Sequence, residues 1–382
     1  MWEDRLSAWR PEGNMEPLLH AVIDPGRQWK DAWSSWRESA DLDRLGPGAI
    51  RLLPLLYKRL KADQMDDPWM GRLAGIYRHT WARNQFLLRD ATEAVRAFTN
   101  AGIPVMLIKG AAMIVSQYHD AGLCPTVDID VLVPDTQALA AVRCLRAAGF
   151  SATGRYEVDV PEKFIRIGFS HPFRSPQGNE IDLHWYLLYF RSFPGADESF
   201  WQHATRAEFN DLPVWLPSPT DMLLLTCLHG LLWSSTSNLR WVADADTLIR
   251  SASIDWNRLA EYSQWPGVAL PLRLSLQYLR DRMGISIPEE SLQTIQSATV
   301  SKGDRWVLMT YSGEESLFWN TLSIWFRHSR FSRKEPTSLL RLFGGLPSFL
   351  ATYWALPSIW HVPRVAIRKI WRRYRPGPSS SS

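Results

Sequence analysis

Two aspartates in an apolar, β-branched segment are the residues of this sequence best suited to chemistry. The segment runs from Val127 to Val133 and carries Asp128 and Asp130. Alternate side chains of a strand share a face, so the two carboxylates point the same way, while Ile129 and Val131 point into the core. Close like charges in an apolar setting are costly, and a divalent cation removes that cost. Mg²⁺ suits such a pair because it takes few carboxylates and completes its shell with water and phosphate oxygens.

A second acidic segment, at 179–185, shows the same alternation. Glu180, Asp182 and His184 share one face of the expected strand, which makes Asp182 a candidate third ligand. Three carboxylates on adjacent strands fit a two-metal centre for phosphoryl transfer, with one ion at the attacking hydroxyl and the other at the leaving phosphates. His184 is at least as readily interpreted as a hydrogen-bonded neighbour of the site.

Upstream of both segments, Lys109 and Gly110 end the short apolar run 103–108, and a helix is expected over 111–118. The expected local unit is therefore a strand, a glycine turn and a helix. Backbone N–H groups at the start of that helix, together with the Lys109 cation, would suit a triphosphate.

Each of these patterns also has a plainer interpretation. Alone, an Asp-x-Asp pair is more often a solvated strand end than a metal site, and only the Lys-Gly turn and the second acidic segment favour the metal here. His229 lies in an apolar helical pattern typical of a core histidine. Arg240 and Asp244 have the spacing of an ion pair within one helix, with a role of Arg240 toward substrate as the alternative. No Walker loop, dinucleotide fingerprint, zinc motif or nucleophile elbow is present.

Around these motifs the periodicity predicts helices before residue 100, mixed elements up to 216, and helices again beyond 217. Helices are expected over 49–57, 76–98, 136–148, 222–233, 241–249 and 268–283, and strands over 103–108, 127–133 and within 150–190. We therefore expect a helical region at 1–100, a catalytic core at 101–216, a helical domain at 217–300 and a tail at 301–382.

Composition and charge favour an intracellular protein with an unusual tail. The three cysteines form no disulfide framework, and the acidic start lacks a secretory pattern, so we expect a cytoplasmic location. From Leu317 onward there are eleven Lys and Arg against one acid. The 22 uncharged residues between Arg341 and Arg364 include Pro347, Pro357 and Pro363, which disfavour one spanning helix. We expect this basic, Trp-rich tail to pack on the protein surface or to dock at an interface rather than to span a membrane. Its arginines and tryptophans suit the anionic headgroups of the inner membrane and, equally, an acidic partner protein or a nucleic acid.

The motifs together resemble the uncharacterised bacterial nucleotidyltransferase family of the DNA polymerase β superfamily. The resemblance is carried by 107–112, 127–133, 180–185, 228–229 and 239–244, and it covers roughly residues 40 to 290. It implies an α+β fold, in which a mixed sheet flanked by helices forms a polymerase β-like core between helical N- and C-terminal regions. The implied activity is transfer of a nucleoside monophosphate from an NTP to an unidentified acceptor, whether small molecule, sugar, peptide or protein.

The same resemblance assigns residues. Asp128 and Asp130 would bind both Mg²⁺ ions and Asp182 would be the third carboxylate, while Lys109, Gly110 and Ala111 would hold the nucleotide. The residues in supporting positions would be His184, Glu180 and Arg240.

Two departures, an altered turn and a missing basic residue, favour an alternative, a catalytically weak nucleotide-binding or scaffolding protein of a biosynthetic complex. Gly110-Ala111 replaces the usual Gly-Ser or Gly-Gly, and sixteen residues separate Ala111 from Asp128. Cys124 stands where a basic residue is expected.

Overall fold

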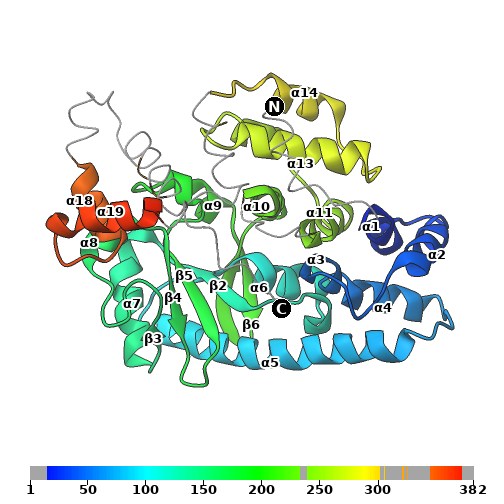
Figure 1. Cartoon of the computed structure of the whole chain (residues 1–382), viewed down its shortest axis with the longest axis horizontal. Helices are drawn as coiled ribbons and strands as arrows, with labels where there is room; N and C mark the ends of the chain where they lie inside the picture. Colours follow the sequence, from blue (N-terminus) through cyan, green and yellow to red (C-terminus); the bar gives the residue numbers. More distant parts are fainter. Residues whose placement is uncertain are drawn as a thin grey trace.

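A seven-stranded mixed sheet forms the centre of the fold in the computed structural model (Figure 1). The structure describes residues 15–232, 239–301 and 345–371, and in addition Arg305, Thr321 and Trp325. The strands are β1 (Met106–Leu107), β2 (Asp128–Leu132), β3 (Ser151–Ala152), β4 (Ser170–Arg174), β5 (Glu180–His184), β6 (Thr205–Phe209) and β7 (Leu212–Leu216). Their order across the sheet is β3-β4-β5-β2-β1-β7-β6. The β2–β5 and β1–β7 pairs are parallel, and the other pairs are antiparallel.

Helices precede, cover and follow this sheet, as the sequence predicts. The N-terminal helices are α1 (Met15–Ile23), α2 (Trp29–Ser39), α3 (Pro47–Ile50), α4 (Leu53–Ala62) and α5 (Met70–Asn100). Within the core lie α6 (Lys109–Met113), α7 (Ala138–Ala147), α8 (Glu162–Ile165) and α9 (Glu198–His203). The later helices are α10 (Pro219–Leu232), α11 (Arg240–Ser251), α12 (Trp256–Tyr262), α13 (Ala269–Asp281), α14 (Glu289–Ser297), α18 (Leu346–Tyr353) and α19 (Val362–Trp371). The α+β class with helical flanking regions is confirmed, whereas the division at residues 100, 216 and 300 stays a prediction.

The long helix α5 packs along the sheet against β2 and β7, and α7 lies beside it (Figure 1). Its buried stripe includes Leu87, Ala91, Ala94, Val95 and Phe98, spaced three to four residues apart so that they share one face. The expected helix over 49–57 is instead divided into α3 and α4. Pro54 lies in the first turn of α4, where a residue without an N–H group interrupts no helical hydrogen bond.

The hairpin of β6 and β7 was not predicted from the sequence. Its two turn residues, Asn210 and Asp211, have φ values of 48° and 63°, and Asn and Asp tolerate this left-handed region better than most residues. β7 pairs in parallel with β1, on the side of β1 opposite to β2. The hairpin therefore extends the sheet beyond the strands that the sequence identifies.

The expected glycine turn after β1 takes a different form. Lys109, rather than Gly110, adopts the left-handed conformation, with φ of 53°, and it is also the first residue of α6. The helix expected over 111–118 is a short α6 followed by a π-helical turn, Ile114–Tyr118, that ends at left-handed His119. The left-handed residue where the chain leaves β1 and enters α6 is thus Lys109.

Parts of the expected tail lie outside the described residues, including Arg372 and Arg373. Within the described part, α18 packs on α8, where the Tyr156 hydroxyl donates to the Thr352 carbonyl. The uncharged run between Arg341 and Arg364 is divided among α18, a 3₁₀ turn at Ile359–His361 and the start of α19. Among the described helices, none combines the length and the apolar character needed to cross a membrane.

Candidate active site

The register of β2 and β5 brings two of the predicted carboxylates together. Asp130 lies directly beside Asp182 across this parallel pair, and Asp128 lies beside Glu180. His184 Nε2 is 3.0 Å from both Asp130 Oδ1 and Asp182 Oδ2. These three ligand atoms all lie within 4.8 Å of one another, so this group could hold a metal ion. The convergence of Asp130 and Asp182 expected from strand alternation is therefore present.

Lys109 completes this polar centre from the other side of β2. Its Nζ atom lies 2.5 Å from Asp130 Oδ1, and the Ile108 N–H donates to the Asp130 carbonyl. β1 and β2 are antiparallel neighbours, and Leu107 is paired with Val131. The residues that follow Leu107 therefore lie beside Asp130. The left-handed turn at Lys109 thus places a cation against a buried carboxylate.

Charge controls protonation in this group. Burial alone would raise the pKa of Asp130, but Lys109 and His184 hold it well below its usual value. Burial would lower the pKa of His184, yet the nearby Asp182 and Asp130 raise it to about 9. Metal-free, the centre therefore pairs an ionised Asp130 with two cations, Lys109 and His184, at neutral pH.

Asp128 is separate from that group, but it lines one cavity together with Asp130. Burial, reinforced by the charge of Asp130, raises the pKa of Asp128 to about 6. Glu180, by contrast, forms an ion pair with Arg174 at 2.9 Å, and 46% of its side chain is exposed. The Glu180 carboxylate thus pairs with Arg174 of β4 instead of joining the group of Asp130, Asp182 and His184.

Helix α5 holds the loop that leads into β2. Buried Asn84 donates its amide N–H groups to the carbonyls of Ala121 and Cys124, at 2.6 and 2.7 Å. Gly122 lies against the Tyr77 ring so closely that a Cβ atom would stand 2.3 Å from it. The Thr126 hydroxyl then donates to the Asp128 carbonyl at 2.7 Å. These contacts fix the entry of β2 and hence the position of the acidic pair.

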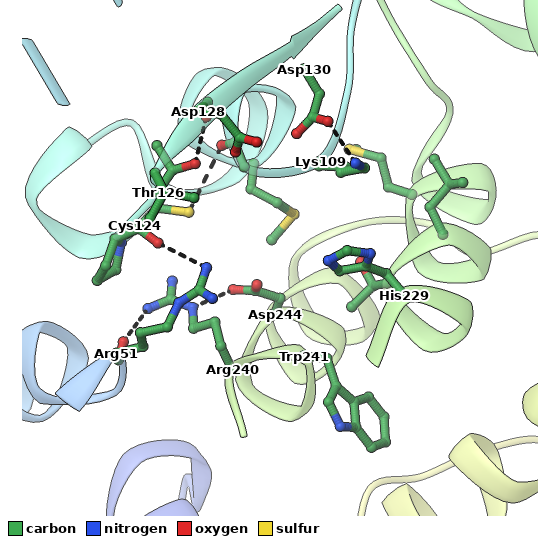
Figure 2. Close-up of a pocket in the computed structure, with 17 residues that line it drawn as sticks. Arg51, Lys109, Cys124, Thr126, Asp128, Asp130, His229, Arg240, Trp241 and Asp244 are labelled. Atoms are coloured by element: carbon green, nitrogen blue, oxygen red, sulfur yellow. Dashed lines mark hydrogen bonds and ion pairs between the residues drawn. The ribbon is translucent and has the colours of Figure 1, made fainter. Parts of the chain in front are cut away.

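Two cavities lie at the acidic centre. The larger of these two, called the larger cavity below, has a volume of about 290 Å³ and opens beside Asp128 and Asp130 (Figure 2). Three cations line it, each from a different part of the chain: Arg51, Lys109 and Arg240. Gly110 also lines it, and a Cβ at that position would lie only 3.3 Å from Thr126 Oγ1. Ala111 does not line this cavity, because it is buried behind the wall. Of the predicted nucleotide-binding residues, Lys109 and Gly110 therefore face the cavity.

Arg240 forms the predicted ion pair and also lines the larger cavity, while its role toward substrate stays a prediction. Its Nε atom donates to Asp244 Oδ1 at 2.8 Å, which is the expected ion pair within α11. Its Nη1 atom donates to the carbonyl of Arg51, and Arg51 in turn donates to the Pro125 carbonyl, each at 3.1 Å. The two arginines thus form one wall, opposite Asp128 and Asp130 (Figure 2). They supply the positive charge that is missing at Cys124.

A second cavity, the smaller cavity, has a volume of about 160 Å³ and contains Asp182 and His184 in its wall. His229 lines both cavities, although it is largely buried as expected for a core histidine. Burial and the neighbouring Lys109 lower the pKa of His229 to about 3, so its imidazole is neutral. Neither Arg51 nor the second cavity was found from the sequence, since no local pattern links them to the acidic strands.

The sequence comparison identifies the class of protein as a nucleotidyltransferase. Residues 49–284 match the family described as "Uncharacterised nucleotidyltransferase", and the chain belongs to that family. No curated protein sequence matches the chain. The chain is also similar to a solved structure, the crystal structure of an antigenic nucleotidyltransferase-like protein from Paracoccidioides brasiliensis. It is 16% identical, with a TM-score of 0.34, over 56% of this chain and 94% of that one. Family membership supports a role in nucleotidyl transfer.

Proposed function

We propose that the protein transfers a nucleoside monophosphate from an NTP to an acceptor and releases pyrophosphate. The observation that carries the proposal is the pairing of Asp130 with Asp182 across β2 and β5, beside a cavity lined by three cations. Paired carboxylates and a cationic wall are the two elements that phosphoryl transfer needs, because negative charge accumulates on the phosphates. The family match is consistent with this activity.

The acidic group fits divalent cations. Asp130, Asp182 and His184 each offer a ligand atom, and these atoms lie within 4.8 Å of one another, close enough to share one cation. Asp130 and Asp182 would hold one ion, and Asp128, with Asp130, would hold another. Bound Mg²⁺ would neutralise phosphate charge and activate an acceptor hydroxyl. His184 must then lose its proton, because a protonated imidazole repels a cation.

The remaining residues would bind and orient the nucleotide. Lys109 would exchange its contact with Asp130 for the triphosphate once cations neutralise the carboxylates. Arg51 and Arg240 would face the phosphates from the opposite wall of the larger cavity. Gly110 would let the backbone approach closely, since even a methyl group there would crowd Thr126.

The test is label transfer by the full chain with Mg²⁺ and each of the four common NTPs, using cell extract as the source of acceptor. Label at the α-phosphorus should reach an acceptor, whereas label at the γ-phosphorus should leave as pyrophosphate. Asp130→Asn should reduce transfer by at least about 10³-fold, equal to about 4 kcal/mol of transition-state stabilisation. Asp43→Asn, on an exposed aspartate far from the sheet, is the matched control.

A second candidate is nucleotide binding without catalysis. One observation favours it: Lys109 and His184 already neutralise the acidic centre without metal. In that case the protein would bind an NTP in the larger cavity, and none of the extracts would receive label. Binding without α-label transfer would therefore support this candidate over the enzyme.

We also propose that α19 contacts an anionic membrane surface. Trp360, in the turn before α19, is 84% exposed, and Ile367 on α19 is 57% exposed. The exposed arginines Arg364 and Arg368 lie on α19 itself. Exposed aromatic and aliphatic side chains beside arginines are typical of interfacial helices.

A further inference from the structure

The smaller cavity differs in chemistry from the larger one. Most of its wall is apolar, formed by Ile108, Phe169, Leu187, Leu188, Leu225 and Leu228. Lys109 and His229 line both cavities, so the two spaces share a wall at the acidic centre. A molecule in the smaller cavity would therefore meet the nucleotide at Asp182 and Lys109.

The size of this cavity matches a single aromatic ring. A buried cavity of about 150 Å³ lined by Leu, Ile and Phe accommodates benzene, and the smaller cavity has about 160 Å³. Phe169 offers an aromatic surface within it, and its ring centroid lies 5.9 Å from that of His184. A sugar would fit poorly, because each hydroxyl facing the leucines would lose its hydrogen bonds to water.

One polar group in this wall lacks a donor. Asp182 Oδ2 accepts from Ser170 Oγ at 3.2 Å and lies 3.0 Å from His184 Nε2. Asp182 Oδ1 is buried without a hydrogen-bond partner in the described part of the chain. Buried carboxylate oxygens are nearly always satisfied, so this oxygen indicates a missing ligand. A hydroxyl group on an apolar body would supply both the donor and the apolar surface that the cavity requires.

We infer that the smaller cavity is the acceptor site and that it takes a phenolic hydroxyl. The ring would lie among Phe169 and the leucines, with its hydroxyl at Asp182. The inference rests on the proposed nucleotidyl transfer. A phenol also suits a carboxylate base, since its hydroxyl loses a proton near pH 10, far more readily than an aliphatic alcohol.

The reaction balances with the groups present. The phenol oxygen forms a bond to the α-phosphorus of the NTP, while the bond from that phosphorus to the oxygen bridging to the β-phosphate breaks. The electron pair of the broken bond leaves with pyrophosphate. The hydroxyl proton passes to Asp182 and then to solvent. The product is an aryl ester of the nucleoside monophosphate.

Binding is tested first, without nucleotide or metal. Titration of 4-methylphenol into the full chain, followed by calorimetry, should show binding, whereas methyl glucoside should show none. Leu187→Phe fills the cavity and should weaken binding by about ten-fold or more. Leu274→Phe, a matched change on α13 outside both cavities, should leave binding unchanged.

A second variant keeps the inference testable if Leu187→Phe fails to fold. Phe169→Ala enlarges the cavity and should let the protein bind 2-naphthol, a two-ring phenol that the unaltered protein excludes. Equal binding of 4-methylphenol by all these variants would overturn the inference, and so would binding of methyl glucoside in its place.

Transfer is tested next, with α-labelled NTP and Mg²⁺. Mass spectrometry should detect the aryl nucleotide ester with 4-methylphenol, and a short tyrosine peptide tests whether the natural phenol is a tyrosyl side chain. Transfer to extract that depends on Asp130, without any use of phenols, would overturn the inference and leave the proposed function intact. Phenol binding that Leu187→Phe abolishes, with no transfer to any acceptor, would refute nucleotidyl transfer and leave the phenol site standing.

Discussion

Lys109 Nζ lies 2.5 Å from Asp130 Oδ1, and Lys109 reaches this position through a left-handed backbone conformation with φ of 53°. Such a conformation costs a residue with a Cβ roughly 1 kcal/mol relative to glycine. The strained turn and the ion pair thus belong to the same residue. This is typical of functional sites, where the surrounding structure imposes the strain.

The first prediction separates the two roles of Lys109. Both Lys109→Gly and Lys109→Ala remove the cation beside buried Asp130, so both should reduce transfer and stability. The free energy of unfolding of Lys109→Gly should nevertheless be about 1 kcal/mol higher than that of Lys109→Ala, since glycine adopts φ of 53° without strain. Urea unfolding measures the difference.

The control for this comparison is exposed Lys58 in the middle of α4. There the order should reverse, with Lys58→Gly about 1 kcal/mol less stable than Lys58→Ala. The same order at both positions would show that the turn at Lys109 is not strained.

The second prediction concerns metal binding. Mn²⁺ or Mg²⁺ should raise the melting temperature of the protein, and Asp130→Asn and Asp182→Asn should abolish that rise, since each removes a ligand. The affinity should increase between pH 5.5 and 7.5, because both Asp128, whose pKa is raised to about 6, and His184, whose pKa is raised to about 9, must lose a proton before a cation binds. Thermal denaturation at pH 5.5 and 7.5 with increasing Mn²⁺ measures both effects. A pH-independent affinity would remove Asp128 from the ligand set.

The third prediction follows from the raised pKa of His184. In EDTA the folded protein holds the His184 proton up to about pH 9, whereas the unfolded chain loses it near 6.5. The stabilisation from the charged imidazole is therefore complete below pH 6.5 and is lost as pH rises toward 9. His184→Gln should remove this dependence, on the order of 2–3 kcal/mol between pH 6 and 9. Chemical unfolding at both pH values tests it, and parallel curves for the two proteins would contradict it.

The fourth prediction tests α19 as a membrane contact. The full chain should float with vesicles rich in phosphatidylserine and should not float with neutral vesicles. Arg364→Gln combined with Arg368→Gln should weaken binding by about 1 kcal/mol for each arginine, or about thirty-fold together. Arg78→Gln combined with Arg96→Gln, on exposed positions of α5, is the matched control. Equal flotation of both double variants would exclude α19 as the contact.

Local pattern predicted the elements that carry the chemistry. Alternation along β2 and β5 placed Asp128 with Asp130, and Asp182 with His184, on shared faces, because strand geometry has a fixed period of two. Helical spacing predicted most of α5 and the ion pair of Arg240 with Asp244, since both depend on residues three or four positions apart. These features are determined by the sequence itself.

Only the tertiary structure decided which of these groups meet. The register of β2 against β5 puts Asp130, rather than Asp128, beside Asp182, and a shift of one residue would have turned the side chains of β5 to the other face. Arg51, His229 and Phe169 reach the two cavities from distant segments, whose packing depends on the whole apolar core. Lys109 is the clearest case, because the sequence assigned its turn to Gly110. The left-handed backbone at Lys109 lies where the chain leaves β1 and enters α6, so it depends on how both elements pack in the folded chain.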